Sequence, residues 1–210
     1  MVNTGTAIEV VLFDVGGVLL TNGWDHIERA AVLAHFNFSE QEIARFEARH
    51  PSPYDSWERD EITAEDYLNA TIFCEPRSFS LDEFITAMKL ESKPLPDNAL
   101  GILGEVAASG RWMVGLLNNE SRLLHEYRIK KYELENHIDL QLSSCYLGLR
   151  KPESAIYRRA IDILGRPADR VLFIDDRAGN TAAAKAAGMN AIQFLGEEPL
   201  RASLQELGIL

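Results

Sequence analysis

Apolar runs and helical patterns alternate near both ends of this chain. Val10 to Phe13 and Val171 to Ile174 are uninterrupted apolar runs, and Trp112 to Leu117 is a third, largely apolar run. Runs of this length without alternation are typical of strands buried on both faces of a parallel sheet. Helical periodicity predicts helices over Asn98 to Ser109 and Glu153 to Leu164. The pattern predicts a Rossmann-like α/β core with three layers, α/β/α, around a parallel sheet.

The middle of the chain has helical periodicity without a convincing strand. The predicted helices are Trp24 to His35, Ser39 to His50, Thr63 to Phe73 and Ser80 to Leu90. The last three begin with a hydroxyl residue followed three positions later by an acid, which is the pattern of a capping box. Pro51-Ser52-Pro53 predicts a break within this segment, and Pro94-Leu95-Pro96 predicts the return to the core. We therefore expect an α-helical cap at residues 21–95, inserted into a core of residues 1–20 and 96–210.

Carboxylates follow two of the predicted strands. Asp14 comes directly after the first apolar run, and Asp175 and Asp176 come at the end of the last one. The carboxyl ends of parallel strands meet at one edge of a sheet, so these three acids are expected to lie together. Like charges in a poorly solvated crevice raise one another's pKa unless a cation offsets the repulsion. Oxygen ligands without Cys or His suit Mg²⁺, and a helix N-cap role for the Asp175-Asp176 pair is compatible with that.

Two further segments carry polar residues to the same edge. Asn118 and Asn119 follow the strand predicted at residues 112–117. Lys151 lies in a loop just before the helix predicted from Glu153, where its ammonium and the helix dipole would both attract a phosphate. A nucleophilic carboxylate, a divalent cation and a phosphate-binding lysine together point to phosphate chemistry.

Composition and charge limit the classes of partner that this chain could bind. At 210 residues, one α/β domain with a sizeable insertion is more probable than two independent domains. The chain has 21 basic and 32 acidic residues, a net charge of −11, which argues against nucleic acid and is most simply interpreted as ordinary solubility. No apolar stretch approaches the roughly 20 residues of a membrane helix, and Met1 to Ala7 lacks the features of a signal peptide. We expect a cytoplasmic protein without a membrane partner.

The two cysteines carry no metal-binding pattern. Cys74 and Cys145 lack ligand-like spacing and an accompanying histidine cluster. We interpret both as buried small residues in a reducing compartment, with a disulfide between them as the less favoured alternative.

Taken together, these residues resemble the haloacid dehalogenase-like (HAD) hydrolases, and within them the phosphatases with a helical (C1) cap and an Asp-x-Gly first motif. The resemblance covers nearly the whole chain and rests on four motifs in order. They are Phe13 to Leu19, Leu116 to Asn119, Leu147 to Pro152, and Ile174 to Asp176 with Asn180 and Ala184 to Gly188.

The resemblance implies a two-step phosphoryl transfer. Asp14 matches the nucleophile that forms an aspartyl phosphate, and Lys151 matches the group that pairs with this nucleophile and with the phosphoryl group. Asn118 and Asn119, together with Lys151, are the expected phosphate-binding residues. The expected Mg²⁺ ligands are Asp14, the backbone carbonyl of Gly16, Asp176, and Asp175 either directly or through a water molecule.

Two positions depart from the pattern of the family. Gly16 stands where active phosphatases usually carry a second Asp that protonates the leaving oxygen and then activates water, a role that typically contributes about 10²–10⁴-fold. Members with Asp-x-Gly are nonetheless regarded as hydrolases. Asn118 stands where Ser or Thr usually binds the phosphate, and its amide still offers two N–H donors.

Three functions remain open from the sequence. The first is a Mg²⁺-dependent phosphatase acting on a small phosphorylated metabolite such as a sugar phosphate. The second is a catalytically impaired protein that binds a phosphorylated ligand or a partner, and the third is a metal-independent 2-haloacid dehalogenase. The oligomeric state cannot be predicted. Residues of the insert that could face a ligand are Trp24, Asp25, His26, Arg45, Trp57 and Arg59, and His26 is one candidate for the missing proton donor.

Overall fold

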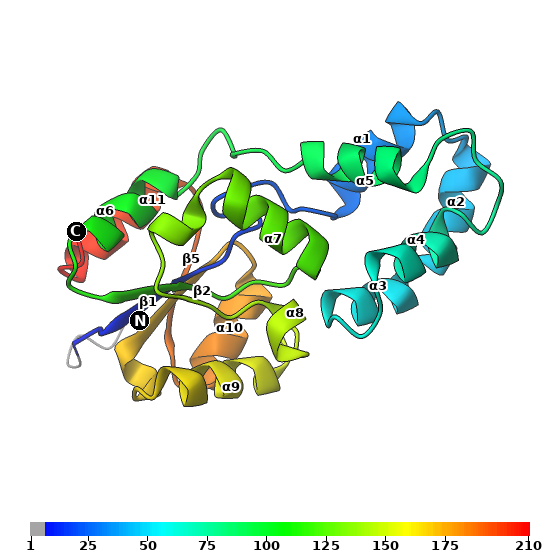
Figure 1. The fold of residues 1–210 in the computed structure, drawn as a ribbon. Helices are drawn as coiled ribbons and strands as arrows, with labels where there is room; N and C mark the ends of the chain where they lie inside the picture. The colour runs from blue at the N-terminus through cyan, green and yellow to red at the C-terminus, as the bar shows by residue number, and fades with distance from the viewer. Residues whose placement is uncertain (1–6) are drawn as a thin grey trace.

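A parallel β-sheet forms the centre of the larger lobe of the molecule (Figure 1). The computed structural model describes residues 7–210, so the expectation for Met1 to Ala7 falls almost wholly outside the described residues. Within them the sheet has five strands in the order β3-β2-β1-β4-β5, all of whose pairings are parallel. The strands are β1 Val10–Phe13, β2 Met113–Leu116, β3 Leu140–Gln141, β4 Val171–Asp175 and β5 Asn190–Gln193. The predicted parallel sheet is confirmed.

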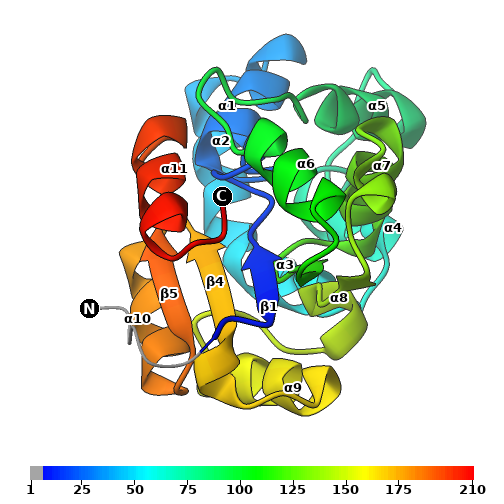
Figure 2. The ribbon, with the colours of Figure 1, turned by 90° about the vertical axis from the view of Figure 1, so that its left-hand side faces the viewer.

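Helices cover both faces of this sheet and complete the three predicted layers. Val11 and Phe13 face a core formed with α6, α7 and α11, whereas Val10 and Leu12 face a second core formed with α9 and α10. Figure 1 shows α6 and α11 on one side of the strands with α9 and α10 on the other, and Figure 2 shows β1, β4 and β5 side by side. The elements are α6 Leu100–Ala108, α7 Arg122–Lys131, η1 Leu134–Asn136, α8 Ser144–Leu147, α9 Ser154–Leu164, η2 Ala168–Arg170, α10 Ala178–Ala186 and α11 Glu197–Glu206.

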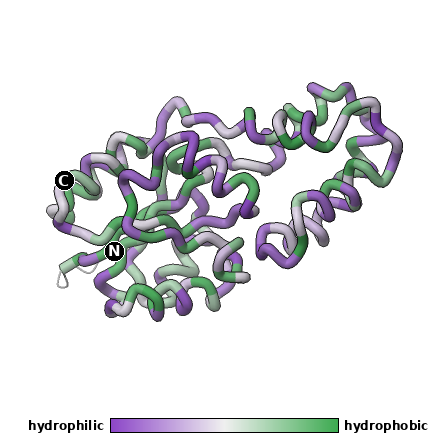
Figure 3. The backbone as a smooth tube through the Cα atoms, viewed as in Figure 1, coloured by the Kyte–Doolittle hydropathy of each residue, from purple (hydrophilic) through white to green (hydrophobic). Residues whose placement is uncertain are grey.

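The helices that follow β1 form a second lobe with its own apolar core, which we call the cap. They are α1 His26–His35, α2 Glu40–Arg49, α3 Pro51–Glu58, α4 Ala64–Thr71 and α5 Leu81–Leu90. Apolar and polar stretches alternate along them (Figure 3), and the apolar side chains meet in one cluster that includes Trp24, Tyr67 and Phe84. The capping boxes predicted at the starts of α2, α4 and α5 are all present.

Two local predictions need correction. Pro51-Ser52-Pro53 ends α2 as expected, but it also begins α3, because proline is well suited to the first turn of a helix, where an N–H has no partner. Cys145 is buried, but the expectation of burial is wrong for Cys74, which is exposed and whose sulfur accepts a hydrogen bond from Arg49 at 2.8 Å. Both cysteines are free, so the alternative of a disulfide between them is also wrong.

The two chain segments that connect the lobes run beside each other. Thr21 donates its backbone N–H to the carbonyl of Lys93 at 2.8 Å, and a β-bridge joins Leu20 to Pro94. Arg128 of α7 donates to the carbonyl of Thr21, which ties the connection to the core. Within residues 7–210, none of the helices combines the length and the apolar character that crossing a bilayer requires.

Candidate active site

The carboxyl ends of β1 and β4 bring three acids together. Asp14 follows β1, Asp175 ends β4 and Asp176 follows it, and each offers a carboxylate oxygen within 4.8 Å of the other two. Lys151 reaches this group from the loop before α9, with its ammonium 2.9 Å from Asp14 Oδ2 and 2.6 Å from Asp175 Oδ2. The structure thus places one cation among three carboxylates at the edge of the sheet.

Asn119 fixes the backbone of Lys151. The Asn119 side-chain oxygen accepts the N–H of Lys151 at 2.8 Å, and its amide nitrogen donates to the carbonyl of Lys151 at 2.9 Å. The ammonium lies 5.1 Å from the ring centroid of Phe173, a contact that favours a buried cation. Asn119 therefore positions the lysine as well as lining the site.

The electrostatics of the site follow from burial. Burial raises the pKa of Asp14 well above its ordinary value; Lys151 opposes the rise and Asp175 adds to it. Burial alone would also raise the pKa of Asp175, but Lys151 and the N–H of Arg177 hold it below the usual range. The pKa of Asp176 is raised by burial and then by Asp175. Lys151 and, at Asp176, Arg177 offset only part of these rises, because the pKa of Asp14 and that of Asp176 both stay raised.

The donor set fits a hard divalent cation. Oδ1 of Asp176 is buried without a hydrogen-bond partner, a cost that a metal ion would remove. Asp175 is already engaged by Lys151, by the N–H of Arg177 at 2.8 Å and by the amide of Asn180 at 3.0 Å. Asp176 is thus the freest direct ligand, whereas Asp14 accepts the N–H of Val15 at 2.8 Å and contacts Lys151 at 2.9 Å. Gly17 has φ +75°, and a Cβ there would overlap the carboxylate of Asp176, so this glycine makes room for the acid.

A small polar pocket opens onto Asp14 between the core and the cap. Its volume is about 100 Å³, and the core lines it with Asp14, Gly16, Asn119, Arg128, Arg150, Lys151, Arg177 and Asn180. Asn22 and Asp25 line it from the connection, and Tyr54 and Glu58 line it from α3. The arrangement suits a small anion more than an extended apolar ligand.

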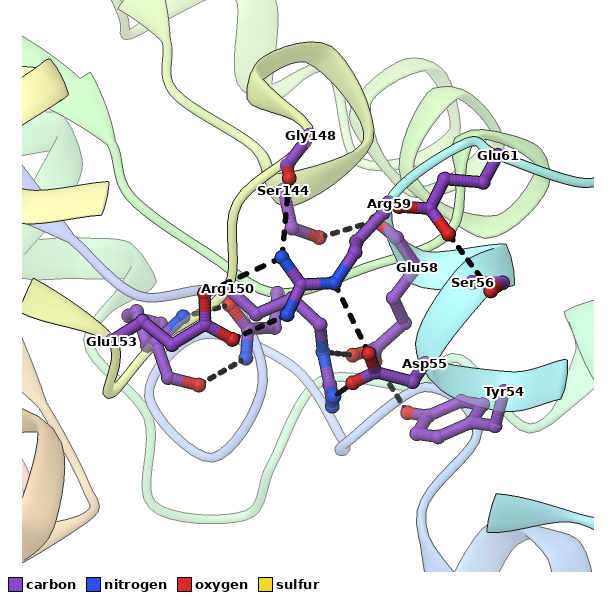
Figure 4. Close-up of polar contacts among 12 residues, drawn as sticks. Tyr54, Asp55, Ser56, Glu58, Arg59, Glu61, Ser144, Gly148, Arg150 and Glu153 are labelled. Atoms are coloured by element: carbon purple, nitrogen blue, oxygen red, sulfur yellow. Dashed lines mark hydrogen bonds and ion pairs between the residues drawn. The ribbon is translucent and has the colours of Figure 1, made fainter. Parts of the chain in front are cut away.

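Ion pairs hold α3 against the loop that carries Lys151 (Figure 4). Arg150 donates to Glu58 at 2.6 Å and pairs with Asp55. Arg59 extends in the opposite direction, from α3 to Glu153 and to the carbonyl of Gly148 at 3.1 Å. Arg150, within the loop, and Arg59, at the end of α3, therefore join the loop to α3 on both sides of Lys151.

Other residues singled out in the sequence lie in different surroundings. Asn118 is buried and does not line the pocket, because its amide faces His125 of α7 at 3.3 Å. Trp24 and Trp57 are buried in the apolar cluster of the cap. The side chain of His26 is 75% exposed and contacts Asp25, while Arg45 pairs with Glu75. Asp25 alone of the six insert candidates lines the pocket.

Several pocket residues were missed in the sequence. Tyr54 and Glu58 were missed because α3 was not predicted, and Arg128 because α7 was not. Arg150 lies within the motif Leu147 to Pro152, so its place beside Lys151 was the one signal that the sequence offered.

A family model and several individual proteins match this chain. A family model described as haloacid dehalogenase-like hydrolase matches residues 8–188. Flavin mononucleotide hydrolase 1 of Arabidopsis thaliana is 25% identical over 96% of this chain and 78% of its own. A pyrimidine 5′-nucleotidase of Escherichia coli is 30% identical over 46% of this chain and 42% of its own, and (S)-2-haloacid dehalogenase 4A of Burkholderia cepacia is 28% identical over 59% and 52%.

Solved structures agree with the fold. The crystal structure of a HAD family enzyme from Bacteroides thetaiotaomicron superposes with a TM-score of 0.80 at 19% identity, covering 95% of this chain and 99% of that one. A second crystal structure of that enzyme, in complex with magnesium and inorganic phosphate, superposes with a TM-score of 0.73 over 89% and 94% of the two chains at the same identity. At this identity the likeness establishes the fold alone.

Proposed function

Because this chain belongs to the haloacid dehalogenase-like hydrolases, we propose that it is a Mg²⁺-dependent phosphatase that hydrolyses a small phosphorylated metabolite, such as a sugar phosphate. The observation that carries the proposal is the contact of Asp14 with Lys151 at 2.9 Å beside a cluster of three carboxylates. The flavin mononucleotide hydrolase and the nucleotidase among its relatives support a phosphoric monoester as substrate.

In this proposal Asp14 attacks phosphorus. A carboxylate oxygen of Asp14 forms a bond to phosphorus while the bond to the leaving oxygen breaks, and water later attacks the same phosphorus and releases Asp14. The ammonium of Lys151 neutralises charge on the equatorial oxygens of the phosphoryl group in both steps. Asn119 keeps that ammonium in place, and Asn118 remains a candidate phosphate donor if its amide turns away from His125.

Asp14, Asp176, the backbone carbonyl of Gly16 and, through water, Asp175 would hold Mg²⁺. The ion, when bound, supplies positive charge that keeps Asp14 ionised and screens the phosphate from the carboxylates. The complex of the Bacteroides enzyme with magnesium and phosphate supports this choice of cation.

The size of the pocket limits the substrate. A polar pocket of about 100 Å³ favours a small phosphorylated compound over a large one. The cap, proposed at residues 21–95, would have to open for entry and would exclude macromolecules once closed. The free cysteines fit the proposed cytoplasmic location, because a reducing compartment keeps thiols unpaired.

The experiment measures phosphate release from p-nitrophenyl phosphate and from a panel of sugar phosphates, with Mg²⁺ or EDTA, for the wild type and Asp14→Asn. We expect release that requires Mg²⁺ and is lost in the variant. Absence of release from every compound would overturn the proposal, and stabilisation of the protein by phosphate without turnover would then identify a binding protein.

A 2-haloacid dehalogenase is the second candidate. Gly16 in place of the second Asp, together with the likeness to the Burkholderia dehalogenase, favours it. The Asp175-Asp176 pair counts against it, because a metal-independent reaction has no use for the unpartnered oxygen of Asp176. Chloride release from 2-chloropropionate in EDTA would favour the dehalogenase over the phosphatase.

A further inference from the structure

The proposed reaction needs a proton donor that the core does not supply at Gly16. The acids that face the pocket, apart from the nucleophile, are Asp25, Tyr54 and Glu58. The arginines of the pocket keep their protons at any ordinary pH, and Lys151 is held charged by Asp14 and Asp175. The donor must therefore be one of the three oxygen acids or bulk water.

Two of the three acids are poor candidates. Asp25 caps α1 and pairs with Arg177 at 2.7 Å, and these hydrogen bonds hold its pKa below the usual range despite its partial burial. Burial and then Glu58 raise the pKa of Tyr54 well above its ordinary value, and its hydroxyl already donates to Glu58. Asp25 is ionised at neutral pH and cannot donate a proton. Tyr54 is too weak an acid to donate its proton to the leaving oxygen.

We propose that Glu58, at the end of α3, is the catalytic acid and base of this site, so that the cap supplies the group that the core lacks at Gly16. The inference rests on the proposed phosphatase function and extends it to one residue of the cap. It explains why an Asp-x-Gly first motif is compatible with hydrolysis in this chain.

The geometry holds Glu58 over the pocket. Its carboxylate accepts from Arg150 at 2.6 Å and from Tyr54, and its backbone carbonyl accepts from Ser144 at 2.7 Å (Figure 4). Asp14 and Glu58 line the same small pocket, of about 100 Å³. An acid at Glu58 therefore faces the space in which a phosphoryl group on Asp14 would carry its leaving oxygen.

The surroundings of Glu58 suit both halves of an acid–base cycle. Burial raises the pKa of Glu58, while Arg150, Tyr54 and Arg177 limit the rise. The Glu120 carboxylate also lies close enough to interact with it. A raised pKa favours the protonated carboxyl group that the first step needs.

The protons balance across the two steps. When Asp14 attacks phosphorus, the carboxyl group of Glu58 gives its proton to the leaving oxygen and becomes a carboxylate. When water attacks the aspartyl phosphate, that carboxylate takes the proton of the water and is a carboxyl group again. Phosphate leaves, and Asp14 and Glu58 are both restored.

The test follows p-nitrophenyl phosphate with Glu58→Gln by rapid mixing. Nitrophenolate needs little protonation, so the first step is expected to proceed, whereas the second step lacks its base. We expect a burst of about one nitrophenolate per protein, a steady rate at least about 10²-fold below the wild type, and phosphorylated Asp14 in the quenched protein. The proposal is overturned if the steady rate falls but neither a burst nor phosphoprotein is seen. It is also overturned if the steady rate stays within about tenfold of the wild type.

Asp55→Asn is the matched control. Asp55 pairs with the same Arg150 but does not line the pocket, so this variant loosens α3 without removing the acid and is expected to show no burst. Glu58→Asp keeps both a carboxyl group and a charged partner for Arg150, so it is expected to turn over faster than Glu58→Gln and without a burst. If Glu58→Gln fails to fold, Glu58→Ala takes its place and is expected to show the burst. A wild type that is inactive on every substrate contradicts the phosphatase function instead.

A second variant tests the same idea by restoring the core acid. Adding Gly16→Asp to Glu58→Gln places a carboxyl group where related phosphatases carry one, and it is expected to abolish the burst and recover turnover. A Cβ at Gly16 would lie 3.0 Å from the side-chain oxygen of Asn22, which can rotate away, and 3.3 Å from the Cα of Asn22, so the backbone there must shift by a few tenths of an ångström. Recovery would be unexplained if Glu58 only held α3 in place.

Discussion

At the scale of single residues, the proposed metal site depends on the contact between Gly17 and the carboxylate of Asp176. Gly17 adopts φ +75° beneath the carboxylate of Asp176, and that carboxylate has a buried oxygen without a partner. The position of Asp14, Asp175 and Asp176 was predictable, because each lies at the end of a buried strand and parallel strands end together. The orientation of Asn118 was not predictable, since it depends on a contact with His125 of α7, a helix without a clear pattern in the sequence.

Gly17→Ala is expected to destabilise the protein and to reduce Mg²⁺-dependent activity. The positive φ costs about 1–2 kcal/mol for a residue with a side chain, and the overlap with Asp176 adds to this. Gly110→Ala is the control, because Gly110 has φ +61° but open space around its Cβ. Urea unfolding and activity together check the prediction, and equal effects of the two substitutions would contradict it.

Asp176→Asn is expected to remove the stabilisation by Mg²⁺. In the wild type, millimolar Mg²⁺ should raise the melting temperature, because the ion binds only the folded carboxylate cluster. The variant should melt higher than the wild type in EDTA, since it relieves the repulsion by which Asp175 helps raise the pKa of Asp176. Asp162→Asn, an exposed change of the same charge on α9, should alter neither result. A Mg²⁺ response that survives in Asp176→Asn would contradict this ligand assignment.

At the scale of elements, the starts of three cap helices were predictable from the sequence, whereas α3 was not. The starts of α2, α4 and α5 are encoded within four residues by capping boxes, so all three were predictable from the sequence. Pro51 permits either a break or a new helix, and the choice for a helix depends on packing of Trp57 in the cap and on pairs with Arg150 in the core. Because those contacts are distant in sequence, the pocket residues of α3 could not be predicted.

Arg150→Met is expected to destabilise the protein by about 3 kcal/mol, because it leaves the buried Glu58 without its cation. Arg122→Met removes a comparable pair between core and cap, Arg122 with Asp60, but both partners are substantially exposed. Its cost should be at most about 1 kcal/mol. Chemical denaturation of both variants measures the free energy of unfolding. Equal losses would show that the buried carboxylate of Glu58 does not need Arg150 as its partner.

At the scale of the whole molecule, the cap is connected mainly by charge. Across residues 7–210, five ion pairs cross between the cap with its connection and the core. They are Arg59–Glu153, Arg122–Asp60, Arg150–Asp55, Arg150–Glu58 and Arg177–Asp25. The apolar cores of the sheet and the cap are separate clusters, although Leu124 of α7 packs with the cap. The two-lobed plan was predictable from periodicity, whereas this charged interface required the structure.

Salt is therefore expected to loosen the cap over the site without unfolding either lobe. The screening length falls from about 10 Å at 0.1 M to about 3 Å at 1 M salt, which weakens the exposed pairs more than the buried contacts. Hydrogen exchange at 1 M NaCl should accelerate in α3 and in the loop at residues 148–153, while β1 and β4 stay protected. KM should rise with salt for the same reason, since binding must draw the cap closed. Exchange that rises equally in β1 would indicate global destabilisation, and exchange that does not change in α3 would mean that apolar packing by Leu124 holds the cap instead.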